Sequence, residues 1–183
     1  LDVKSSQKCK KFLEDLGYKV TIWKTGHSHI KNKMKKIHSK FAGEMSGHIF
    51  FGDEYYGYDD AIYSSIRFLE LIEKNFNLEE FLNYFKNNFS TPEIKINCSD
   101  DKKFSVIENL KLKIQDMYST KNCNFIDGIR VDLDDGWYLI RASNTENSII
   151  IRIDGNTKEN FVNLSNEVKT LLKSEKIRIN YNS

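Results

Sequence analysis

The sequence has few of the residues and segments that cross-link a chain or carry it through a membrane. Cys9, Cys98 and Cys123 are its only cysteines, too few and too widely spaced for a disulfide framework or a paired-cysteine zinc site. No apolar run approaches the roughly 18–20 residues that cross a bilayer, and no signal peptide is visible. These absences predict a protein of the reducing cytoplasm that has no membrane partner.

The chain also lacks a strong charge of either sign. Its formal net charge is +2, which argues against a nucleic-acid partner, because such proteins use a strong basic field. Only five residues are arginine, and Arg130, Arg141 and Arg152 fall close together. A guanidinium binds phosphate or carboxylate through two parallel donors, so this stretch is a candidate anion site.

Proline is nearly absent as well. The single proline, Pro92, lies in the polar connection "NNFSTPEIKI", where the residue before it is driven away from helix. We place a domain boundary there, with an α/β domain at 1–89 and an α+β domain at 90–183, a small sheet with helices on one face. Because Leu1 leads straight into a helical pattern, the chain reads as a piece of a longer polypeptide.

In the first half, the sequence predicts helices separated by one strand and glycine-rich loops. Ser5 or Ser6 can cap a helix, and "YKVTIW" (18–23) alternates as a strand that leads into the loop "KTGHSHIK". A lysine-rich helical segment follows at 30–40. Further helices are predicted after Asp59 or Asp60 and after Asn77. Each of the three capped helices has an apolar stripe; in chain order, these are Cys9, Phe12, Leu13 and Leu16; Ile62, Ile66 and Leu69; and Leu78, Phe81, Leu82 and Phe85.

In the second half, the patterns predict strands at 94–98, 125–133, 137–143 and 148–154, with a turn at "DDG". One helix precedes the last three strands and another follows them, and "KIRINY" (176–181) is a candidate final strand. The stripes of these two helices are Phe104, Ile107, Leu110 and Ile114, and Phe161, Leu164, Val168 and Leu171.

Two short stretches could carry chemistry. In "LIRASNTENS", Arg141 ends a strand, and Ser143, Asn144 and Thr145 could add donors around a phosphate; a solvated hairpin loop is the alternative. In "GEMSGH", Glu44, Ser46 and His48 alternate, so on an extended segment they would point to one side.

The "GEMSGH" stretch leaves three interpretations open. A carboxylate, a hydroxyl and an imidazole between glycines suit the hydroxyls of a sugar. A metal site would combine Glu44 and His48 with His27 and His29, although the spacings match no zinc signature. The third interpretation is a polar rim above the apolar segment 49–51. Lys24 and His27 lie near a predicted strand end, where α/β folds place ligands.

Taken in order, the stretches "DVKSS", "KTGHSHIK", "AGEMSGHIFF", "GYDDAIY", "STPEI", "DGIRVD", "GW" and "IRASNTEN" resemble the C-terminal part of the α-D-phosphohexomutases, the bacterial phosphomannomutase/phosphoglucomutase family. The resemblance covers nearly the whole chain. It implies a third domain of the family, incomplete at its N-terminus, followed by the fourth.

The resemblance also implies roles for individual residues. Glu44 and Ser46, with His48 beside them, would bind sugar hydroxyls, and Lys4 and His27 would line the same site, where either could assist proton movement. Ser143, Asn144, Thr145 and Arg141 would hold the phosphate that is not being transferred, and Arg152 would be a supporting charge. Family members often have proline where Asn147 stands and a small residue where Tyr138 stands.

The activity implied is the interconversion of hexose 1-phosphate and hexose 6-phosphate, on mannose or glucose, through a hexose 1,6-bisphosphate. The phosphoserine and the Mg²⁺ ligands of the family would lie in upstream domains, so we expect this chain alone to be inactive. A phosphoglucosamine mutase relative and a non-catalytic sugar-phosphate binding module are the alternatives.

Overall fold

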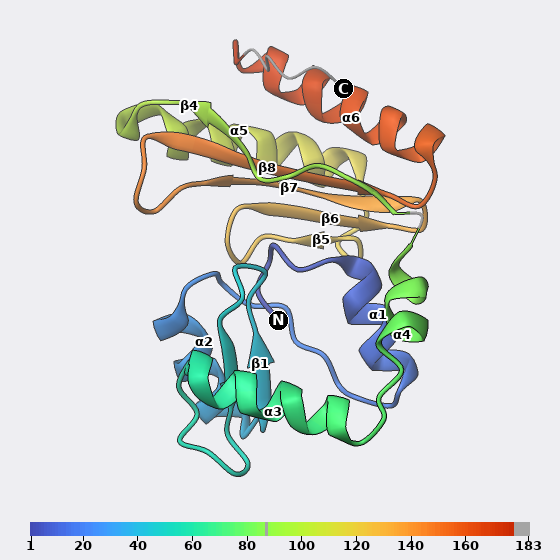
Figure 1. The fold of residues 1–183 in the computed structure, drawn as a ribbon. Helices are drawn as coiled ribbons and strands as arrows, with labels where there is room; N and C mark the ends of the chain where they lie inside the picture. The colour runs from blue at the N-terminus through green and yellow to red at the C-terminus, as the bar shows by residue number, and fades with distance from the viewer. Residues whose placement is uncertain (87, 178–183) are drawn as a thin grey trace. The chain divides into compact units, whose positions relative to one another are not determined.

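The computed structural model describes residues 1–86 and 88–177 of the 183-residue chain. The chain divides into two compact units, Leu1–Lys86 and Asn87–Ser183 (Figure 1). None of the helices in the described residues is long and apolar enough to cross a membrane. The predicted strand at 176–181 falls almost entirely outside the described residues.

The first unit contains four helices and one hairpin. Its elements are α1 (Gln7–Asp15), α2 (His27–Ile37), β1 (Phe41–Gly43), β2 (Ile49–Phe51), α3 (Ala61–Glu73) and α4 (Leu78–Phe85). The predicted caps are confirmed, since Ser6, Asp60 and Asn77 each accept a backbone N–H of the helix that they precede. Helix α1 ends before Gly17, which has a φ of +87°.

The strand predicted at 18–23 is wrong. Only Trp23 pairs, in a parallel bridge to Asp2. A strand needs a partner that runs alongside it, and here only Leu1–Val3 lies beside the segment: Trp23 donates to the Leu1 carbonyl at 2.8 Å and Val3 donates to the Trp23 carbonyl at 2.9 Å.

Helix α2 begins three residues earlier than the predicted start at Ile30. Gly26 precedes it with a φ of +119°, a conformation that side chains oppose, and turns the backbone into the helix. His27 and His29 therefore lie on the first turn of a helix rather than in a loop. The helix ends at His38, whose backbone is left-handed.

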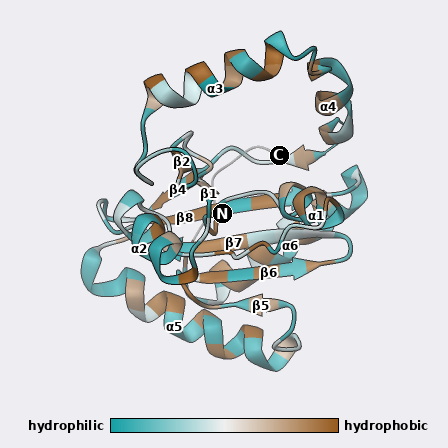
Figure 2. Cartoon of the chain, turned by 90° about the horizontal axis from the view of Figure 1, so that it is seen from below, coloured by the Kyte–Doolittle hydropathy of each residue, from teal (hydrophilic) through white to brown (hydrophobic). Residues whose placement is uncertain are grey.

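The expectation that the apolar stripe of α3 is buried is also wrong. Ile62, Ile66 and Leu69 are 75%, 51% and 64% exposed, and Figure 2 colours hydrophobic residues along this helix. The helix packs instead through Tyr63, whose ring lies 5.3 Å from that of Phe51 on β2. A cap fixes where a helix begins, but burial of its stripe needs a second surface. The buried core of this unit is small and consists of Ile30, Met34, Ala42 and Phe50.

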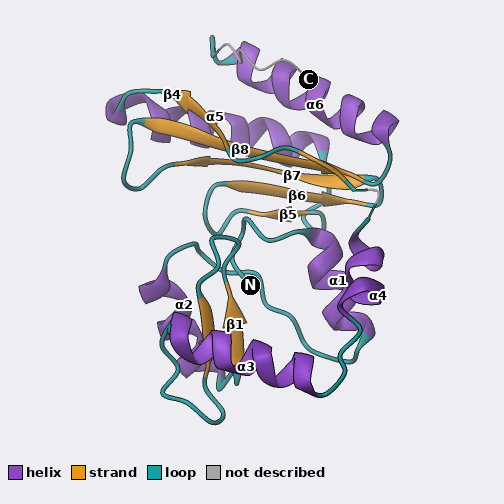
Figure 3. Ribbon diagram, viewed as in Figure 1, coloured by secondary structure: helices purple, strands orange, loops and turns teal. Residues whose placement is uncertain are grey.

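The second unit is a six-stranded antiparallel sheet with two helices on one face (Figure 3). Strands β3 (Phe89–Ser90), β8 (Ser148–Gly155), β7 (Gly136–Ala142), β6 (Ile129–Leu133) and β5 (Cys123–Asn124) follow one another, and β4 (Ile94–Asn97) also pairs with β8. The helices are α5 (Asp100–Met117) and α6 (Lys158–Ser174). This arrangement confirms the predicted α+β class.

Alternation along β7 sorts its side chains between two faces. Tyr138, Ile140 and Ala142 belong to the core that both helices cover, whereas Trp137 and Arg141 point to the other face. The predicted stripes of α5 and α6 are nearly right; however, Phe104 is 54% exposed and Val106 takes its place in the core.

Candidate functional site

Two groups of predicted residues are described separately, one in each unit. We call Lys4, His27, Glu44, Ser46 and His48 the hydroxyl cluster, and Arg141, Ser143, Asn144 and Thr145 the anion cluster. Each name states the chemistry that the side chains offer.

The residues 44–48 form a tight turn, so the expectation that they are extended is wrong. Strands β1 and β2 pair antiparallel up to Gly43 and Ile49, Glu44 donates its N–H to the His48 carbonyl at 2.9 Å, and Gly47 donates to the Glu44 carbonyl at 2.9 Å. Gly47 has a φ of +91°, which glycine adopts without strain. The hairpin, rather than alternation, therefore positions Glu44, Ser46 and His48.

Two contacts fix the side chains at the ends of this turn. Glu44 is buried, and its Oε1 accepts the N–H of Gly26 at 2.5 Å, which brings the turn beside the first residues of α2. His48 is half-exposed, and its Nδ1 lies 3.0 Å from a carboxylate oxygen of Asp59. Ser46 and His27 are exposed.

A buried carboxylate that sequence reasoning missed links the three segments of the hydroxyl cluster. Asp2 is fully buried, and it accepts the hydroxyl of Ser5 at 2.7 Å, the hydroxyl of Thr25 at 3.1 Å and the N–H of Met45 at 3.1 Å. Lys4, the loop before His27 and the turn after Glu44 are thereby tied to one residue. The only available signal was its place in the motif "DVKSS".

The anion cluster begins at the end of β7. Arg141 is 4% exposed, and its Nη2 donates to Asp127 at 3.1 Å. Its Nε–H is buried and has no acceptor among residues 1–86 and 88–177. A buried donor without an acceptor costs about 1–3 kcal/mol, so this guanidinium has unused capacity for an anion.

Ser143 has a structural role in the turn in addition to the predicted role as a donor to phosphate. It is buried, and its Oγ accepts the N–H groups of Thr145 and Glu146 at 3.3 and 3.1 Å, which closes the turn. Because an oxygen that accepts two bonds keeps its own hydrogen, the hydroxyl can still donate. Asn144 and Thr145 are exposed on the same turn.

Residues of β4 and α5 anchor this turn, and sequence reasoning missed them. Lys103 is buried and donates to the Glu146 carbonyl at 2.9 Å, while it also pairs with Asp100. Lys95 donates to the carboxylate of Glu146 at 2.8 Å. The amide nitrogen of Asn147, in the orientation that suits its neighbours, donates to Asp100 at 2.8 and 3.0 Å. Asn147, where the resemblance led us to expect proline, therefore has a partner in α5.

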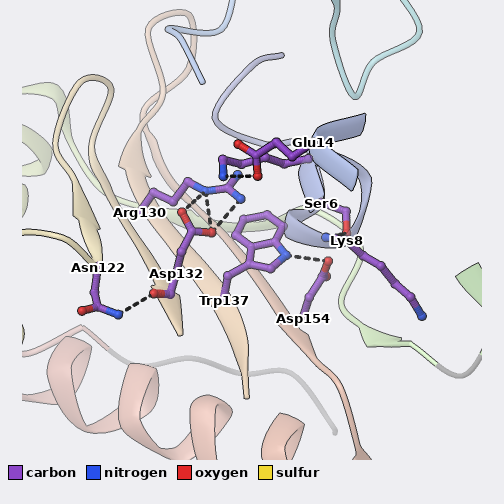
Figure 4. A network of polar contacts seen from close by, with 9 residues as sticks. Ser6, Lys8, Glu14, Asn122, Arg130, Asp132, Trp137 and Asp154 are labelled. Atoms are coloured by element: carbon purple, nitrogen blue, oxygen red, sulfur yellow. Dashed lines mark hydrogen bonds and ion pairs between the residues drawn. The ribbon is translucent and has the colours of Figure 1, made fainter. Parts of the chain in front are cut away.

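The other two arginines of the stretch, Arg130 and Arg152, lie beside Trp137 on the sheet face opposite the helices. Figure 4 shows Arg130 over the Trp137 ring. Arg130 is fully buried, its guanidinium carbon lies 4.2 Å from the centre of the Trp137 ring, and it binds Asp132 at 2.8–3.1 Å. The indole N–H donates to Asp154 at 2.8 Å, and Arg152 pairs with the same carboxylate at 3.4 Å. Arg130 is thus committed to the sheet.

Arg152 lies on the same face as Arg141. The β7–β8 register pairs Arg141 with Ile150 and Leu139 with Arg152, so the two arginines are diagonal neighbours, roughly 7–8 Å apart at the backbone. This placement is compatible with a supporting charge.

The metal-site interpretation has no support in the part of the chain that the structure describes, since no three His, Cys, Asp or Glu residues there could hold an ion. Glu44 bonds to Gly26, and His48 to Asp59. The described residues therefore do not fit a zinc ion or the Mg²⁺ that the resemblance implies.

Comparison with known families covers both units. Residues 1–88 match the model of phosphoglucomutase/phosphomannomutase, alpha/beta/alpha domain III, and residues 93–171 match the model of phosphoglucomutase/phosphomannomutase, C-terminal domain. The chain belongs to the phosphoglucomutase/phosphomannomutase family. The predicted resemblance and fold class are confirmed.

Named members of the phosphoglucomutase/phosphomannomutase family are similar over nearly the whole chain. The phosphomannomutase/phosphoglucomutase of Pseudomonas putida is 41% identical over 93% of this chain and 37% of its own length, and that of Pseudomonas aeruginosa is 38% identical over 94% and 37%. A crystal structure of a family protein from Burkholderia thailandensis has a TM-score of 0.83, 30% identity, and coverage of 97% of this chain and 38% of its own. The chain thus spans little more than a third of the length of these relatives.

Tyr138 stands where the resemblance led us to expect a small residue, and it lies on the sheet face opposite to that of Arg141. It points to the helix-covered face, where its hydroxyl donates to Glu167 of α6 at 2.8 Å, and Tyr118 donates to the same carboxylate at 2.7 Å. Burial, together with this carboxylate, raises the pKa of both tyrosines above the usual value. Both phenols therefore stay protonated as donors, and Tyr138 serves the core.

Proposed function

We propose that this chain is the substrate-binding C-terminal part of a phosphohexomutase that interconverts the 1- and 6-phosphates of mannose or glucose. The anion cluster holds the phosphate that is not transferred, and the hydroxyl cluster holds the sugar ring. The family assignment supports the class of enzyme.

The observation that carries the proposal is the state of Arg141. An almost fully buried guanidinium, held by one carboxylate and with its Nε–H unsatisfied, ends a strand beside a turn with exposed polar side chains. A phosphate supplies acceptors for such donors, and each charge-assisted bond contributes about 1.5–3 kcal/mol.

The hydroxyl cluster supports the second half of the proposal. Glu44 uses one oxygen on the Gly26 N–H, so its other oxygen can accept from sugar hydroxyls. Asp59 lies 3.0 Å from Nδ1 of His48, so the other ring nitrogen, Nε2, can form a hydrogen bond with a sugar hydroxyl. Ser46 and His27 add exposed polar groups, and Lys4 lies on the segment that Asp2 ties to them.

The proposed mechanism relies on binding that tolerates two orientations. A phosphoserine donates its phosphoryl group to the hexose phosphate, the resulting 1,6-bisphosphate turns around, and its other phosphate returns to the serine. Both orientations offer a dianion to Arg141 and a pair of hydroxyls to Glu44. Positioning and charge stabilisation account for most of phosphoryl-transfer catalysis, so these residues contribute by holding the ligand.

In this proposal, the phosphoserine and the residues that bind Mg²⁺ lie in other domains of the same polypeptide. The whole protein is a cytoplasmic enzyme. We therefore expect residues 1–183 alone to give no mutase turnover with glucose 1-phosphate in a coupled assay of glucose 6-phosphate. Turnover at a rate proportional to the amount of this chain would contradict that expectation.

The hydroxyl cluster is tested by Glu44→Gln, which keeps an acceptor for the Gly26 N–H but removes the charge. We expect the affinity for mannose 1-phosphate to fall about 5- to 10-fold in calorimetric titration, because hydrogen bonds to a charged acceptor are worth roughly 1 kcal/mol more than neutral ones. The affinity for inorganic phosphate should not change.

Glu54→Gln is the matched control, since Glu54 is exposed elsewhere in the same unit. Equal weakening of both ligands by Glu44→Gln, or of neither, would refute the assignment of Glu44 to the sugar.

One relative favours a second substrate. A probable phosphoglucosamine mutase of Methanothermobacter thermautotrophicus is 35% identical over 74% of this chain. Tighter binding of glucosamine 6-phosphate than of mannose 6-phosphate would favour that branch. Binding of both without a catalytic serine elsewhere in the polypeptide would favour a non-catalytic binding module.

A further inference from the structure

We propose that the Asp127–Gly128 turn is a positioning device for Arg141, and that Asp127 orients the guanidinium for the phosphate. This inference rests on the proposed function of the anion cluster. It concerns two residues that the fold places beside Arg141 from a different strand.

The backbone geometry brings the turn against Arg141. Strand β6 pairs with β7 in the register Ile129↔Ile140, so the next position on each strand places Gly128 opposite Arg141. A Cβ on Gly128 would lie 2.4 Å from the Cβ of Arg141 and 2.6 Å from the Ile140 carbonyl oxygen. Gly128 also has a φ of +86°. Only glycine allows this approach at this conformation.

The contact between the side chains of Asp127 and Arg141 fixes the orientation of the guanidinium. The carboxylate of Asp127 accepts from Nη2 of Arg141 at 3.1 Å, and the two side chains are only 12% and 5% exposed. Water is therefore mostly excluded from this contact. The carboxylate of Asp127 holds the guanidinium of Arg141 through its Nη2 group. Fixing a donor before the ligand arrives reduces the ordering cost of binding.

Asp127 is also a negative charge near a site for a dianion, so it could oppose binding. If repulsion were larger than orientation, removing the carboxylate would tighten phosphate binding. We assign the larger effect to orientation, because Asp127 accepts from Nη2 of Arg141 whereas the Nε–H of the same guanidinium remains for another acceptor.

The test compares Asp127→Ala with Asp127→Asn in titrations with inorganic phosphate. Alanine removes the acceptor, and we expect the dissociation constant to rise about 10-fold. Asparagine keeps an acceptor oxygen in a turn that it tolerates, and we expect it to restore the affinity to within about 2-fold of wild type. An unchanged or lower dissociation constant for Asp127→Ala, or equal loss in both variants, would overturn the proposal.

A second readout needs no ligand. In wild type the Arg141 Nε–Hε resonance should be sharp and slow to exchange, and in Asp127→Ala it should broaden, with recovery in Asp127→Asn. Should alanine prevent folding, Asp127→Ser takes its place, since a serine hydroxyl lies farther from the guanidinium. An Arg141 resonance that is identical in all variants would overturn the positioning role. If wild type binds no phosphate, the proposed function fails, and this resonance still decides the role of Asp127.

Discussion

Arg141→Ala is expected to weaken the binding of inorganic phosphate and of mannose 1-phosphate by about 10- to 100-fold. The substitution removes at least one charge-assisted hydrogen bond, each worth about 1.5–3 kcal/mol, and every 1.4 kcal/mol corresponds to a factor of ten. Both ligands should be affected alike because both present a phosphate. Calorimetric titration of each ligand into wild type and variant measures the effect.

Two further variants separate this effect from damage to the fold. Arg141→Lys keeps the charge but loses the planar fork, so we expect an intermediate affinity. Arg67→Ala removes a partly exposed arginine of the first unit that pairs with Glu54 and Glu70. It should leave the affinities for inorganic phosphate and for mannose 1-phosphate unchanged. Wild-type affinity for phosphate in a folded Arg141→Ala protein would contradict the assignment of the anion cluster.

Asp2→Ala is expected to lower the free energy of unfolding of the first unit by about 3 kcal/mol. Asp2 is fully buried and accepts three hydrogen bonds, and its removal takes this acceptor from the buried hydroxyl of Ser5 and from the part-buried donors of Thr25 and Met45. Each lost hydrogen bond is worth about 1 kcal/mol. The segments around Ser5, Thr25 and Met45 should lose order together, and mannose 1-phosphate should bind more weakly as a result.

Because the chain has two units, a single melting temperature does not report this effect. Hydrogen exchange should accelerate in peptides from 1–48 and remain unchanged in the sheet of the second unit. Asp15→Ala, at the exposed end of α1, is the matched control and should change neither. Wild-type exchange throughout the first unit of Asp2→Ala would show that Asp2 does not hold these segments.

The parts of the fold that the sequence predicted correctly depend on local signals. Ser6, Asp60 and Asn77 cap helices through side chains that bond within three residues, so no distant partner is needed. The strands β6, β7 and β8 are short runs rich in β-branched and aromatic residues, and a turn with Gly136 at a φ of +149° joins two of them.

Two errors arose where a distant partner decides the outcome, and one arose from a local turn. The segment 18–23 alternates like a strand, yet only Leu1–Val3 lies beside it. The "GEMSGH" stretch appeared extended because its side-chain types alternate, whereas Gly47 turns the backbone back. The stripe of α3 has helical spacing but stays exposed.

The candidate site was only partly visible in the sequence. The motifs identified Glu44 and Arg141 directly, and the family resemblance supplied their roles. Asp2 and Asp127 were not singled out, because most of their partners are distant in the sequence: Met45 lies 43 positions from Asp2, and Arg141 lies 14 positions from Asp127. Lys103 was also missed, because its partner Glu146 is distant in the sequence and because lysine is common throughout this chain.

The account's central claim is that the hydroxyl cluster binds sugar hydroxyls and that the anion cluster binds phosphate. The most direct measurement is a titration of isotopically labelled protein with mannose 1-phosphate, followed through the backbone amides of Gly26, Ser46 and Thr145 and the Nε–Hε group of Arg141. We expect all four signals to shift with mannose 1-phosphate, whereas inorganic phosphate should shift only those of Thr145 and Arg141. Shifts confined to one cluster at saturating mannose 1-phosphate would contradict the claim.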